Sequence, residues 1–118
     1  MVCRPTEPEA KDYVEYYAET NADWGGVDKL MELQFAHAKS FPLDLLEGVR
    51  SSMAVGQGGY QLIGTPQMVA DGIVRLKECG FNGTTLSFVD YVKKFSYFRD
   101  NVLPLLEKAG IRHPVEKI

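Results

Sequence analysis

The sequence predicts an α/β fold in which short parallel strands alternate with helices. Short runs of β-branched and apolar residues are separated by longer stretches in which apolar residues recur at helical spacing. The expected order is strand, three helices, strand, helix, strand, helix, and strands separated by helices pair in parallel. The 118 residues, of which 45% are hydrophobic, are enough for one domain with one core. We therefore expect three βα units, the first of which contains additional helices.

The first expected unit comprises a strand and three helices, at residues 1–4, 7–20, 24–39 and 43–53. Thr6 and Glu9 fit a capping box, in which a hydroxyl and a carboxylate each satisfy a free backbone N–H group. Asp23 is a fresh N-cap before the second helix. The segment 40–42, which contains a proline, separates the second helix from the third.

The remaining elements are a loop at 55–60, strands at 60–63 and 83–89, and helices at 66–79 and 92–109. Three glycines between positions 56 and 59 predict a mobile or sharply turned loop. Thr65 and Pro66 are an N-cap and a first helical residue. The β-branched and apolar run at 83–89 predicts a buried strand. Pro104 removes a backbone donor inside the last helix and predicts a kink there.

Composition argues against several classes of function. The net charge of −3 gives no basic excess for neutralising phosphates, so nucleic acid is not an expected partner. The longest apolar runs fall far short of the ~20 residues that span a bilayer, and no signal peptide is recognisable, so we expect no membrane partner and a cytoplasmic location. Cys3 and Cys79 form no ligand cluster with His37 or His113, so we expect no metal site.

Five stretches of the sequence carry a resemblance to a known family. They are Val2-Cys3-Arg4-Pro5-Thr6 with Glu9-Ala10, then GGYQLIGTPQMVA at 58–70, LKECGFNG at 76–83, LSFVDY at 86–91 and YFRDNVLPLL at 97–106. Each piece is short, but the ordered set covers nearly the whole chain. Together they resemble the C-terminal portion of luciferase-like flavin-dependent monooxygenases, and most closely the branch of alkanesulfonate, dimethylsulfone and pyrimidine monooxygenases.

The resemblance implies a partial (β/α)₈ TIM barrel, made of the last three βα units with an extra helical insertion. A complete barrel of this kind takes about 250 residues. The resemblance implies an oxidoreductase that uses reduced FMN and O₂ on a small organic substrate, with the reduced flavin supplied by a separate flavin reductase. It also places the first five strands, with most flavin contacts, upstream of Met1. We therefore expect the chain to be inactive alone, and no catalytic residue can be assigned.

Open strand edges make a partner necessary for such a chain. Three short parallel strands leave both edges of their sheet without neighbours. We expect the edges to be covered either by other copies of the chain or by an N-terminal companion that carries the missing strands.

The expected cofactor-binding residues are Arg4, Gln57, Gly58, Gly59 and Ser87. In a (β/α)₈ barrel the functional groups lie at the C-terminal ends of the strands. Arg4 follows the first strand and can direct its guanidinium at a phosphate or sulfonate, although a solvated surface arginine is an equally simple reading. The resemblance implies that Gln57, Gly58 and Gly59 belong to a lid-like segment that folds over the flavin. The alternative interpretation is that this segment is a flexible connector. Ser87 can donate a hydrogen bond at the end of the third strand.

The expected substrate-binding residues are Tyr60, Phe88 and Tyr91. Tyr60 adjoins the lid-like loop, while Phe88 and Tyr91 follow the last strand. Phe88 can pack on a substrate or an isoalloxazine ring, or can be an ordinary core residue. A second reading of the whole chain is a non-catalytic oligomerisation or binding module built from the same βα units. Such a module melts cooperatively as a defined homo-oligomer.

Overall fold

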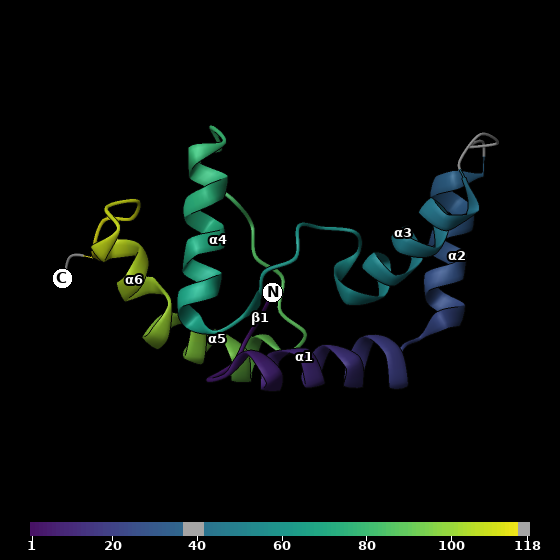
Figure 1. Ribbon diagram of the computed structural model, residues 1–118, viewed down its shortest axis with the longest axis horizontal. Helices are drawn as coiled ribbons and strands as arrows, with labels where there is room; N and C mark the ends of the chain where they lie inside the picture. Colours follow the sequence, from purple (N-terminus) through teal and green to yellow (C-terminus); the bar gives the residue numbers. More distant parts are fainter. Residues whose placement is uncertain (37–41, 116–118) are drawn as a thin grey trace. The chain divides into compact units, whose positions relative to one another are not determined.

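The structure, a computed structural model, describes residues 1–36 and 42–115 and is mostly helical (Figure 1). The elements in order are β1 (Val2–Cys3), α1 (Glu7–Glu15), the π-helical segment η1 (Tyr16–Thr20), α2 (Trp24–Phe35), α3 (Leu43–Gly56), β2 (Ile63–Gly64), α4 (Pro66–Glu78), α5 (Tyr91–Asn101) and α6 (Leu103–Lys108). The chain divides into two compact units, Met1–Lys11 with Leu62–Ile118 as unit 1, and Asp12–Gln61 as unit 2. Each unit is described by itself.

The predicted partial (β/α)₈ TIM barrel is wrong. Within residues 1–36 and 42–115 the only strands are β1 and β2, each two residues long. The segment 83–89, expected as a buried strand, forms neither strand nor helix. Its composition favours a strand, but a strand exists only where a neighbour exchanges backbone hydrogen bonds with it. The described residues supply no such ladder to this segment, so the three expected βα units are not formed.

The strands β1 and β2 pair in parallel, with Val2 opposite Ile63 and Cys3 opposite Gly64. The N–H of Val2 donates to the carbonyl of Leu62 (2.8 Å), and the N–H of Arg4 donates to the carbonyl of Gly64 (3.0 Å). Alternate residues of a strand direct their backbone groups to opposite edges. The amine of Met1 accordingly donates across the other edge of β1, to the carbonyl of Ser87 (2.8 Å). This single hydrogen bond does not make the segment 83–89 a third strand, and the sheet consists of β1 and β2 within the described residues.

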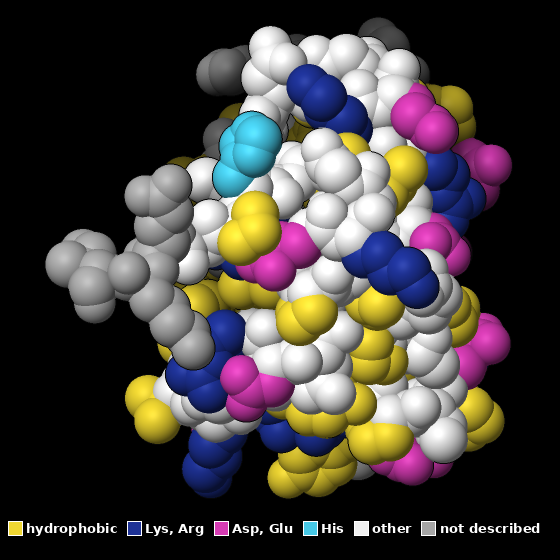
Figure 2. All heavy atoms as spheres, turned by 90° about the vertical axis from the view of Figure 1, so that its left-hand side faces the viewer, with side chains coloured by type: hydrophobic (Ala, Val, Ile, Leu, Met, Phe, Trp, Pro, Cys, Tyr) yellow, Lys and Arg dark blue, Asp and Glu magenta, His cyan; other side chains and the backbone are white. Residues whose placement is uncertain are grey.

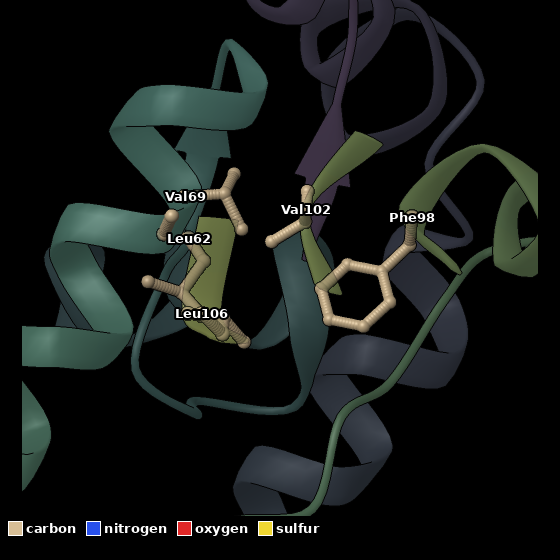
Figure 3. Close-up of a cluster of buried hydrophobic side chains, with 6 residues drawn as sticks. Leu62, Val69, Phe98, Val102 and Leu106 are labelled. Atoms are coloured by element: carbon tan, nitrogen blue, oxygen red, sulfur yellow. The ribbon is translucent and has the colours of Figure 1, made fainter. Parts of the chain in front are cut away.

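The core of unit 1 lies where α4, α6 and the residue before β2 meet. Its buried residues are Leu62, Val69, Ala70, Phe98, Val102 and Leu106. Figure 3 shows the side chains of Leu62, Val69 and Leu106 gathered together, with Val102 and Phe98 alongside. The helix α4 lies so close that a Cβ atom on Gly72 would stand 2.5 Å from a methyl carbon of Leu62. Burial of each large apolar side chain contributes roughly 1.5–3 kcal/mol, so these few residues hold the unit together.

The helices of unit 1 begin at local caps and break at a proline. Thr65 accepts a hydrogen bond at its hydroxyl from the N–H of Met68 (3.3 Å) at the start of α4. Asp90 accepts from the N–H of Lys93 (3.1 Å) at the start of α5. The single helix predicted over 92–109 is divided into α5 and α6 next to Pro104, because proline offers no N–H to the turn before it.

The helix predicted over 7–20 is helical throughout, but its last turn, η1, is a π-helix. At its start the N–H of Glu9 donates to the hydroxyl of Thr6 (3.4 Å). The carboxylate of Glu9 accepts from that same hydroxyl (3.0 Å) and not from the backbone. Only one half of the predicted capping box is therefore present.

Unit 2 is held together by contacts of α3 with α2 and with η1. The guanidinium of Arg50 makes a two-point ion pair with Asp28 (Nε–Oδ1 2.6 Å, Nη2–Oδ2 3.0 Å) and stacks over the ring of Trp24 at 4.1 Å. The hydroxyl of Tyr17 donates to the carbonyl of Val55 (2.8 Å). The Arg50 hydrogen bond holds the pKa of the Asp28 carboxyl below its usual value. The expected end of the second helix, at residues 37–39, lies outside the described residues.

The assignment of the core of unit 1 can be tested by replacing valine with alanine at one buried and one exposed position. Val102 is fully buried, whereas Val92 is 86% exposed. Val102→Ala removes two methyl groups from the core and leaves a cavity, so we expect a loss of about 2 kcal/mol in the free energy of unfolding. Val92→Ala is the matched control and should change it by less than about 0.5 kcal/mol. Urea unfolding followed by far-ultraviolet circular dichroism measures both; equal effects would contradict the assignment of the core.

Candidate functional site

The eight residues predicted to form the site fall into two groups, one in each unit. Arg4, Ser87, Phe88 and Tyr91 belong to unit 1. Gln57, Gly58, Gly59 and Tyr60 belong to unit 2. Neither group is a closed shell around a ligand, and each is described here within its own unit.

Helix α3 extends into the segment 55–60 that was predicted as a lid-like loop. Helix α3 continues to Gly56, beyond its predicted end at residue 53, so residues 55 and 56 are helical. Gln57 follows with a left-handed backbone (φ 56°), and its N–H donates to the carbonyl of Met53 (2.9 Å). The bond from Gln57 to Met53 is the single bond of an αL helix end, and the N–H of Gly58 also reaches back to the carbonyl of Ser52 (3.2 Å). Gln57 and Gly58 therefore terminate α3.

An aromatic cluster surrounds Phe88 in unit 1. Its ring lies 5.4 Å from that of Tyr91, 6.1 Å from Phe95 and 5.8 Å from Phe98, centroid to centroid, in edge-to-face geometry. Phe98 is buried in the core, whereas Tyr91 and Phe95 are 57% and 47% exposed. Phe88 therefore joins the core to the surface. The ring faces of Tyr91 and Phe95 can bind a flat or apolar ligand by stacking.

Two cations lie near this cluster. Arg4 is half-buried at the end of β1, and Lys94 is half-buried in the first turn of α5. Burial lowers the pKa of Lys94, the positive charge of Arg4 lowers it further, and Asp90 opposes both. Burial also raises the pKa of Tyr97, with smaller contributions from Cys3 and Glu9. Arg4 and Lys94 lie close enough to influence each other electrostatically, and two such cations can attract an anionic group.

Sequence reasoning missed Lys94, Phe95 and Tyr97. Their spacing was a usable signal, because residues three and four apart share a helix face. Phe95 follows Tyr91 by four positions, and Lys94 follows it by three. Ser87 is exposed, and its carbonyl accepts the hydrogen bond from Met1.

Ligation of a metal and nucleophilic catalysis by cysteine find no support in this region. Among residues 1–36 and 42–115, no cluster of three or more His, Cys, Asp and Glu side chains is placed to hold a metal ion. Burial raises the pKa of the Cys3 thiol to about 11, although Arg4 opposes the shift. The thiol therefore stays protonated near neutral pH and is a poor nucleophile.

The outer surface of unit 1 mixes apolar and charged side chains. Figure 2 shows apolar side chains exposed at several places on the face toward the viewer, with lysine and arginine side chains among them. The described helices include none with the length and apolar character needed to cross a membrane.

The end of α3 provides a test of the cap. A non-glycine residue pays a steric cost in the left-handed region, so Gln57→Gly should raise the free energy of unfolding by about 1 kcal/mol. Gln57→Ala removes the same side-chain atoms but keeps the Cβ, and should give no such gain. Urea unfolding followed by Trp24 fluorescence reports on this unit. A stabilisation by alanine equal to that by glycine would rule out relief of backbone strain as the cause.

The raised pKa of Cys3 predicts slow alkylation. Against an ordinary value of 9.0, a pKa of about 11 leaves roughly 100-fold less thiolate near pH 8. We expect iodoacetamide to label Cys3 far more slowly in the native chain than in urea, whereas the exposed Cys79 serves as the internal control. The pKa of the Cys3 thiol is higher in the folded chain than in the unfolded chain. The protonated thiol therefore makes its full contribution to stability below pH 9, and this contribution is lost as the pH rises through about 11. Native labelling of Cys3 at its unfolded rate would contradict this assignment.

No family model matches this chain, and neither a curated protein nor a solved structure matches it. The comparisons therefore give no support for a luciferase-like family, for flavin binding or for oxidoreductase activity. The resemblance stands on the five sequence stretches alone, and the TIM barrel that it implied is not formed.

Proposed function

We propose that this chain contributes a C-terminal part of a flavin-dependent monooxygenase, which uses reduced FMN and O₂ to oxidise a small organic substrate. The observation that carries the proposal is the ordered set of five stretches between Val2 and Leu106 that resembles such enzymes. We further propose that the chain acts in the cytoplasm, receives its reduced flavin from a separate reductase, and is inactive without a companion polypeptide.

The folding of unit 1 supports this proposal. Four of the five stretches lie within that unit, and the remaining one, 58–70, supplies its residues Leu62 and Val69. Four of the five stretches contribute residues to one buried core or to the side chains packed against it, and no residue of the stretch 76–83 is among them. They also bring Arg4 to the same side of the unit as the first turn of α5.

The side chains present fit part of a flavin mononucleotide. Reduced FMN, when bound, supplies the electrons that activate O₂. The exposed rings of Tyr91 and Phe95 can stack on a planar ring system, and Arg4 with Lys94 can neutralise an anionic group. The hydroxyl of Ser87 can donate a hydrogen bond to a ring oxygen or nitrogen.

A fusion protein tests the proposal. In this fusion the upstream part of a luciferase-like monooxygenase comes first, and this chain follows it directly. The upstream part ends just before the position that corresponds to Met1. We expect the fusion to bind about one equivalent of FMN, while the chain alone leaves both FMN and Trp24 fluorescence unchanged. In the fusion, Arg4→Ala should weaken FMN binding by about tenfold, since it removes a charge-assisted contact.

Two results would count against the proposal. A fusion that unfolds cooperatively but binds no FMN would refute the assignment to flavin chemistry. Tight, stoichiometric binding of FMN by the chain alone would refute the need for a companion. Lys11→Ala is the control for Arg4→Ala, because Lys11 is an exposed cation on α1 and should not affect the flavin.

Self-association is a second candidate function. The two-stranded sheet is too small to satisfy its own edges, and several large apolar side chains are exposed. In unit 1 these include Phe81 (60%), Val89 (52%) and Val92 (86%). Such a non-catalytic oligomerisation module would sediment as the same defined oligomer with or without FMN.

A further inference from the structure

We draw no further inference here: the strongest candidate, the exposed apolar surface of Val89, Tyr91, Val92 and Phe95 at the start of α5 in unit 1, carries none because nothing in the structure shows what covers it.

Discussion

The parallel pairing of β1 with β2 is the contact on which unit 1 depends. Two backbone hydrogen bonds, from Val2 to Leu62 and from Arg4 to Gly64, join parts of the chain about 60 residues apart. They position Leu62 in the core beneath α4 and fix the backbone of Arg4 beside α5. They also leave the opposite edge of β1 facing the segment 84–88, where the Met1 amine meets Ser87. The core, the candidate site and the exposed segment all follow from this one pairing.

The features that the sequence predicts well are those decided by neighbours along the chain. The N-cap roles of Thr65 and Asp23 are local, and so is the effect of Pro104; each is found where its chemistry requires it. The strands are different, because a strand needs a partner that may lie anywhere in the sequence. The run at 83–89 has strand composition but no adjacent ladder among the described residues, so the third strand that composition predicted does not form, and neither does the barrel that the resemblance implied.

The same distinction explains the candidate site. Phe88 and Tyr91 are three residues apart, and their contact was foreseeable from the sequence. The approach of Lys94 to Arg4 joins residues 90 positions apart and was not. Gln57 is a third case: the nearby glycines predicted a lid-like segment, and the structure shows Gln57 with a left-handed backbone at the end of α3, while the lid role stays a prediction. A glycine-rich pattern indicates turning of the chain but does not say whether that turn moves.

The two proposals for function meet at one segment. Residues 83–88 combine strand-forming side chains with unpaired backbone groups, which is costly only while the segment has no neighbour. In the monooxygenase proposal a companion polypeptide covers this segment, and in the self-association proposal a second copy does.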